Sequence, residues 1–118
     1  MNASSPAVLN GPFDLTYDSL TAVLPKSASG VFAIGYVDGL DRFRVQRVGR
    51  AGADIREQLR TLIGSGNQFK YRLTMTEREA FEIECALFHK LRPPSNISHP
   101  DRPRGSGWRC PHCLQYHR

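Results

Sequence analysis

The C-terminal stretch, residues 95–118, most constrains how this chain can fold. It is rich in Pro, Gly and Arg and poor in apolar side chains, so burial alone cannot order it. Within it, Cys110 and Cys113 are separated by two residues, the spacing with which two thiolates bind one tetrahedral ion. The chain has 3 cysteines, so disulfides cannot pair them all. We therefore expect a structural zinc that ties this tail to the fold, and a metal-free thiol pair is the alternative.

A four-coordinate site needs two further ligands, and the helix expected before the tail can supply them. Cys85 and His89 are an i, i+4 pair, so their side chains can converge on one point. His99, in the loop between that helix and the cysteine pair, is the alternative ligand in place of Cys85 or His89. A closed set of four protein ligands leaves no position for water, so the ion would hold the fold and do no chemistry. The expected ligands are Cys85, His89, Cys110 and Cys113.

The first half of the chain contains a predicted β-hairpin. Residues 30–37 are a buried apolar run, Asp38-Gly39 is a turn signal, and residues 42–48 alternate polar with apolar side chains. Residues 13–24 are ambiguous, because their apolar positions fit a short helix that covers a sheet. Residues 1–12 are small and polar, and we expect a flexible N-terminal tail there.

The second half is predicted to contain two helices and a strand. Apolar residues at helical spacing over residues 55–63 predict the first helix, and residues 69–73 a third strand. Thr76 followed by Glu79 is a capping box, which predicts that a long helix begins at residue 77 and continues to about residue 91. The order β-β-α-β-α indicates an α+β fold with a small three-stranded antiparallel sheet flanked by helices.

A length of 118 residues suits one domain. We expect the fold proper over residues 13–96 and the zinc-stapled extension over residues 97–118, packed on the same domain. The sequence has neither a signal peptide nor an apolar run of membrane-spanning length, which favours a cytoplasmic protein with no membrane association. A balance of 16 Lys and Arg against 11 Asp and Glu gives a net charge of +5, which suits a polyanionic partner such as nucleic acid.

Residues 30–96 resemble the GIY-YIG nuclease superfamily, which includes homing endonucleases and an excision-repair nuclease. Gly30-Val31-Phe32 stands where the first family motif lies, and Arg47-Val48-Gly49 where the second lies. Residues 78–96 are similar to the segment that carries the metal-binding glutamate and, twelve residues later, an asparagine. These two roles fall on Glu84 and Asn96. The tail resembles that of a bacterial subgroup of GIY-YIG-like proteins.

The resemblance implies metal-dependent hydrolysis of a phosphodiester, with Mg or Mn held by Glu84 and with Asn96 ordering the site. From its place on the apolar face of the helix alone, Glu84 would instead reach solvent or pair with an arginine. The chain also departs from the family, because Phe32 and Arg47 replace tyrosines and Gln58 replaces an arginine. Arg47 and Arg56 are the expected catalytic cations. Tyr36 and Tyr71 are candidates to supply a missing hydroxyl, and Arg60 is a further candidate cation.

Three functions follow, and the sequence leaves them open. The first is a divergent endonuclease that cleaves DNA at Glu84. The second is a catalytically inactive module that binds nucleic acid, and the third is an interaction module with zinc for stability only. The oligomeric state is not predicted. The expected nucleic-acid contacts are Arg50, Arg60, Arg102, Arg104, Trp108 and Arg109.

Overall fold

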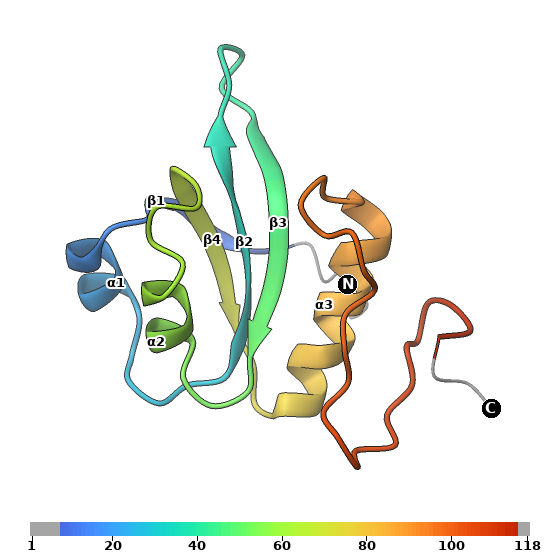
Figure 1. Cartoon of the computed structure of the whole chain (residues 1–118). Helices are drawn as coiled ribbons and strands as arrows, with labels where there is room; N and C mark the ends of the chain where they lie inside the picture. The colour runs from blue at the N-terminus through green and yellow to red at the C-terminus, as the bar shows by residue number, and fades with distance from the viewer. Residues whose placement is uncertain (1–7, 116–118) are drawn as a thin grey trace.

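The computed structural model describes residues 8–115. A four-stranded antiparallel sheet with the strand order β1-β4-β2-β3 lies between two helical layers (Figure 1). Helices α1 and α2 cover one face of the sheet, and α3 covers the other. The elements in chain order are β1 (Asn10–Asp14), α1 (Tyr17–Val23), β2 (Gly30–Val37), β3 (Phe43–Ala51), α2 (Ile55–Arg60), β4 (Gln68–Leu73) and α3 (Glu77–Leu91).

The α1/α2 face of the sheet carries the larger of its two cores. Phe32 and Ile34 of β2 lie opposite Tyr71 and Phe69 of β4, so these side chains project to the same face. Leucines and an isoleucine of α1, α2 and the loops beside them close over these side chains. The buried members are Leu15, Leu20, Leu24, Phe32, Ile34, Ala51, Ile55, Leu59 and Phe69.

The α3 face holds a second, smaller core. Val31 and Ala33 alternate with the residues of the first core along β2, as side chains of a strand must, and Val48 of β3 joins them. Ala80 and Leu87 of α3 pack against this row. Each face of β2 is therefore buried, and this accounts for the continuous apolar run in its sequence.

The sheet has four strands, so the expectation of three was wrong by one. Asn10–Asp14 forms β1 and pairs antiparallel with β4, with Phe13 opposite Phe69. Its sequence contains one apolar side chain and no alternation, so the pairing edge of β4 orders it rather than its own pattern. Residues 10–12, which we expected in a flexible tail, belong to this strand, and residues 1–7 lie outside the described part of the chain.

The predicted hairpin, capping box and long helix are confirmed. The hairpin turns between Asp38 and Arg42, where the Asp38 Oδ1 accepts from the backbone N–H of Leu40 and Arg42. Thr76 Oγ1 accepts from the Glu79 N–H at 3.0 Å at the start of α3. Helix α2 ends at Arg60, three residues before the predicted end. No helix over the described residues 8–115 is both long and apolar enough to cross a membrane.

The tail begins by closing the free edge of β3. The Ser95 N–H donates to the Gln46 carbonyl at 2.9 Å, and the Asn96 side chain bonds to Val48. Beyond this point the described tail contains neither helix nor strand and runs beside α3 (Figure 1). Its position therefore depends on side-chain contacts with α3 and β3.

Candidate metal centre and polar groove

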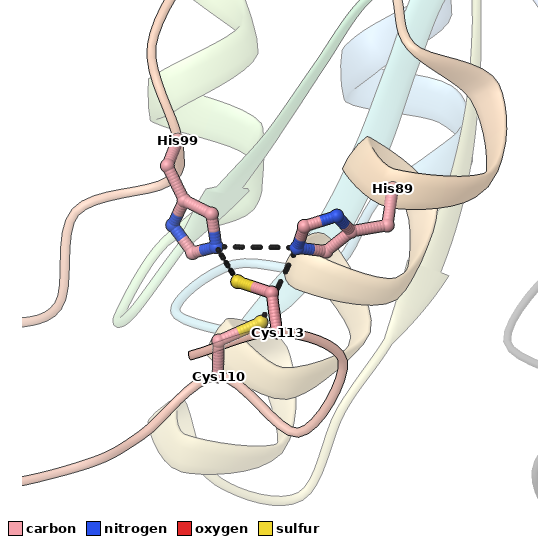
Figure 2. A group of neighbouring side chains, drawn as sticks. All are labelled: His89, His99, Cys110 and Cys113. Carbon is pink, nitrogen blue, oxygen red and sulfur yellow. Dashed lines mark hydrogen bonds between the residues drawn. The ribbon is translucent and has the colours of Figure 1, made fainter. Parts of the chain in front are cut away.

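Four side chains from three segments converge where the tail turns back on α3. His89 belongs to the last turns of α3, His99 to the loop after it, and Cys110 and Cys113 to the tail (Figure 2). One potential ligand atom of each lies within 4.8 Å of the others. These four residues, which we call the metal centre, are close enough to hold a metal ion.

The ligand atoms of the metal centre are separated by distances typical of atoms that share one ion. His89 Nε2 lies 3.3 Å from His99 Nε2 and 3.4 Å from Cys110 Sγ. Cys113 Sγ lies 3.5 Å from His99 Nε2. Figure 2 shows both imidazoles and both sulfurs pointing toward one common point.

Contacts around the metal centre prepare its atoms for coordination. His99 Nδ1 lies 2.9 Å from the Pro100 carbonyl oxygen, so Nδ1 carries the proton and Nε2 keeps a lone pair for the metal. Backbone N–H groups of His112 and Gln115 donate to Cys110 Sγ and Cys113 Sγ, as expected around thiolate ligands. Burial, followed by the neighbouring His99, lowers the pKa of His89, which favours the neutral imidazole that a metal ligand must be.

Cys85 does not belong to the group, so the expected ligand set is corrected and His99 takes its place. Cys85 is completely buried in a small cluster with Phe81 and Cys110, against which Trp108 packs. Burial raises the pKa of its thiol, and the adjacent Cys110 raises it further. Cys85 lies one helical turn before His89, on the side of α3 that is packed against the tail. It therefore acts as a small apolar side chain in that packing.

A groove of about 610 Å³ opens beside β3, and we call it the polar groove. Its walls come from β3, the loop that follows it, α2, α3 and the start of the tail. Most of the positions singled out by the family motifs line it, although they are distant in sequence. These are Phe32, Arg47, Gln58, Glu84 and Asn96. The Phe32 ring lies so close to Gly49 that a Cβ there would fall 2.5 Å from its Cζ.

Glu84 is the one buried charged side chain among the described residues, with 7% of its surface exposed. Its Oε1 accepts from Arg50 Nη1 at 2.6 Å. Burial raises the pKa of the Glu84 carboxyl, and the Arg50 guanidinium opposes this shift. The structure therefore has the arginine pairing that the helical position alone suggested, with the carboxylate at the side of the polar groove.

Asn96 fills both hydrogen-bonding positions of one residue on the edge strand. Its Oδ1 accepts from the Val48 N–H at 2.8 Å, and its Nδ2 donates to the Val48 carbonyl at 3.0 Å. This side-chain amide imitates a neighbouring strand at the point where β3 has none. Asn96 thereby attaches the beginning of the tail to the wall of the polar groove.

The polar groove is acidic although the chain is basic. Five carboxylates and two guanidinium groups line it, namely Asp54, Glu57, Glu77, Glu84, Asp101, Arg47 and Arg50. Arg47 is exposed, whereas both ends of the Arg50 guanidinium are engaged, at Glu84 and at the Asp101 carbonyl. A groove with this balance favours a cation, and a phosphate would need a cation to enter with it.

Arg56 and Arg60 do not line the polar groove. Arg56 donates from Nε and Nη2 to the Leu24 carbonyl at 3.0 and 2.6 Å, and so caps the end of α1. Arg60 pairs with Glu57 and lies over the Tyr17 ring. Both arginines line a smaller pocket of about 320 Å³ between α1 and α2. The expectation of Arg56 as a catalytic cation is therefore not supported by its position.

The remaining predicted residues also lie away from the polar groove. Tyr71 packs against Phe13 in the larger core, and Tyr36 lies on the hairpin, so neither brings a hydroxyl to Glu84. Trp108 is half-buried against Phe81, with 6.0 Å between ring centroids. Less of its ring is therefore available to stack on a nucleotide base than we expected. Arg102 donates to the Trp108 carbonyl at 2.8 Å. Arg104 and Arg109 are exposed.

Two features of the site were not anticipated. The first is the pairing of Arg50 with Glu84, because Arg50 was expected to contact phosphate. The signal for this pairing was Glu84 itself, since a glutamate on the apolar face of a helix needs a buried partner for its charge. No feature of the sequence indicates that the Asp101 carbonyl accepts from the same arginine.

Comparisons with family models, with curated proteins and with solved structures find no match for this chain. The resemblance to GIY-YIG nucleases therefore depends on the motif residues alone.

Proposed function

We propose that this chain is a divergent metal-dependent endonuclease of the GIY-YIG type, which acts on DNA phosphodiester bonds in the polar groove. The observation that carries the proposal is the convergence of the motif positions. Phe32, Arg47 and Asn96, which come from different strands and from the tail, line the same groove as Glu84. Random surface placement would not bring them together with the one buried carboxylate among the described residues.

The charges of the polar groove support metal assistance. Mg or Mn bound at Glu84 would supply a Lewis acid that neutralises the phosphate. Arg47 lines the groove and is exposed, and in this proposal it would donate to a phosphate oxygen. Asn96 holds the β3 wall in position through Val48. Asp101 and Glu77 add negative charge that attracts the cation.

A catalytically inactive module that binds nucleic acid is the second candidate, and two observations favour it. Phe32 has no hydroxyl and Gln58 has no charge at the positions where the family has a tyrosine and an arginine. Arg50 already neutralises Glu84 at 2.6 Å, and a divalent cation would have to compete with it. Such a module would bind DNA through exposed tail arginines such as Arg104 and Arg109.

We further propose that the metal of the metal centre is a structural zinc. Ligands of a tetrahedral ion lie about 1.63 bond lengths apart, so Zn–N and Zn–S bonds of about 2.0–2.3 Å predict separations of about 3.3–3.7 Å. The nitrogen–nitrogen distance of 3.3 Å and the two sulfur–nitrogen distances of 3.4 and 3.5 Å agree with this range. Two histidines and two cysteines are a common structural zinc set.

The proposed activity is tested with the zinc-loaded protein, supercoiled and branched DNA, and Mg or Mn. Glu84→Ala should abolish cleavage. Glu82→Ala is the matched control, because Glu82 lies on the same helix, 40% exposed and paired with Arg78. Cleavage that survives in Glu84→Ala would refute the proposed site. No cleavage by the wild type, with DNA binding that weakens as salt rises, would favour the inactive module.

A further inference from the structure

We infer that Arg50 is a positioning residue that joins the metal centre to Glu84, so that the metal-held tail determines how the groove carboxylate is held. The importance of Glu84 rests on the proposed function, whereas the connection itself does not. Arg50 extends from β3 toward α3, between the polar groove and the tail. It was expected to bind phosphate, but its contacts indicate a different role.

The guanidinium of Arg50 bridges two elements with its two ends. Nη1 donates to Glu84 Oε1 at 2.6 Å, and Nη2 donates to the Asp101 carbonyl at 2.5 Å. Its Cζ lies 5.2 Å from the centroid of the Phe81 ring, which supports the guanidinium plane. Arg50 is therefore oriented by three contacts, and two of them involve the surroundings of the metal centre.

The first connection to the metal centre runs along the backbone. His99, a member of the metal centre, precedes Asp101 by two residues, and its Nδ1 contacts the carbonyl of the intervening Pro100 at 2.9 Å. The described tail after Asn96 has no helix or strand that would hold Asp101 in place. Coordination of His99, two residues away, would therefore help to fix where the Asp101 carbonyl lies.

The second connection runs through packing. The Phe81 ring beneath Arg50 belongs to the same buried cluster as Cys110, another member of the metal centre. Withdrawal of the tail would remove Cys110 and Trp108 from one side of Phe81. Both connections lead to the same guanidinium, so the arrangement at Glu84 and the occupancy of the metal centre are thermodynamically linked.

Linkage is reciprocal, and this gives a test that needs no DNA. Arg50→Lys keeps the charge but cannot bridge Glu84 and Asp101 with a planar fork. Competition with a chelator measures the affinity of the full chain for Co²⁺. This affinity should be about tenfold weaker in Arg50→Lys than in the wild type, as expected for the loss of a charge-assisted hydrogen bond. Arg47→Lys is the matched control, because Arg47 lines the same groove without these contacts, and its affinity should match the wild type. A Co²⁺ affinity of Arg50→Lys within twofold of the wild type would overturn the inference.

Two further measurements separate positioning from a general structural role. Amide exchange of β2 in the loaded proteins reports the stability of the sheet, and the inference requires it to stay unchanged in Arg50→Lys. If Arg50→Lys lowers the protection of the β2 amides from exchange by as many-fold as it lowers the affinity for Co²⁺, the inference is overturned. Combining Glu84→Gln with Arg50→Lys should weaken Co²⁺ binding no more than Arg50→Lys alone, since both act through one contact, and additive losses would also overturn it. These outcomes do not depend on cleavage, so the endonuclease proposal can fail while the linkage stands.

Discussion

Replacing Asn96 with alanine should lower the free energy of unfolding by about 2–4 kcal/mol. The Asn96 amide bonds the Val48 N–H at 2.8 Å and the Val48 carbonyl at 3.0 Å. Val48 is 1% exposed, and the truncation leaves its N–H and its carbonyl without partners. Each unsatisfied group costs about 1–3 kcal/mol, and access of water from the polar groove keeps the sum below the upper limit.

Urea denaturation of the zinc-loaded protein measures this loss. Asn96→Asp tests the donor separately, because an aspartate keeps the acceptor for the Val48 N–H but sets a carboxylate oxygen against the Val48 carbonyl oxygen. It should therefore also be less stable than the wild type. A decrease below about 0.5 kcal/mol for Asn96→Ala would show that water replaces the amide at no cost, and would refute its role in closing the β3 edge.

Three further predictions concern Glu84, Arg56 and the tail. Burial raises the pKa of the Glu84 carboxyl in the folded protein above its ordinary value of 4.5. The folded state therefore binds the proton more tightly than the unfolded state, and this contribution to the free energy of unfolding is complete below pH 4.5. It is lost as the pH rises through the raised pKa. The unfolding free energy of the wild type relative to Glu84→Gln should therefore fall over this range in urea titrations, and a rise would contradict the shift. Arg56→Ala should destabilise the fold by about 1–3 kcal/mol, through its lost bonds to the Leu24 carbonyl, without changing any cleavage rate; a slower rate at unchanged stability would place it in catalysis. Removing the metal with a chelator should speed amide exchange over residues 97–115 far more than in β2, and uniform protection would show that the tail is ordered without metal.

The sequence predicts the central part of the fold because local signals and burial agree there. The β2–β3 hairpin combines an apolar run, a turn signal at Asp38 and an alternating strand, and all three are found. The start of α3 at Thr76 follows from its capping box. Strand β1 was missed because its order comes from pairing with β4, and a single apolar residue, Phe13, carries no periodicity.

The metal centre shows where spacing arguments reach their limit. The i, i+4 relation placed Cys85 and His89 on one face of α3, and a wheel does not show which residue of such a pair the tail approaches. The tail covers Cys85 with Trp108 and presents His99 beside His89. The position of His99 depends on the path of a loop without regular structure, so the sequence could offer it as an alternative but could not select it.

The predicted residues of the polar groove also differ in how well the sequence located them. Glu84, Asn96 and Arg47 were predicted from motifs that imply a common site, and they line one groove. Arg56 was expected there because it lies on the same helix as Gln58, which replaces the family arginine, but its side chain reaches toward the end of α1 instead. Motifs whose residues come from several elements indicate which side chains share a site, whereas a position on one helix does not show which neighbouring element the side chain will contact.

Four side chains lie close enough to hold a metal ion, and the proposed zinc would tie to α3 the tail that carries Asp101 into the polar groove. The identity of the four ligands is therefore the most direct test of this arrangement. Metal content and the Co²⁺ absorption spectrum of the wild type, Cys85→Ser and His99→Ala provide it. The structure predicts one ion per chain with a two-thiolate spectrum in the wild type and in Cys85→Ser, and loss of tight binding in His99→Ala. Loss of the ion in Cys85→Ser, with a three-thiolate spectrum retained in His99→Ala, would contradict it.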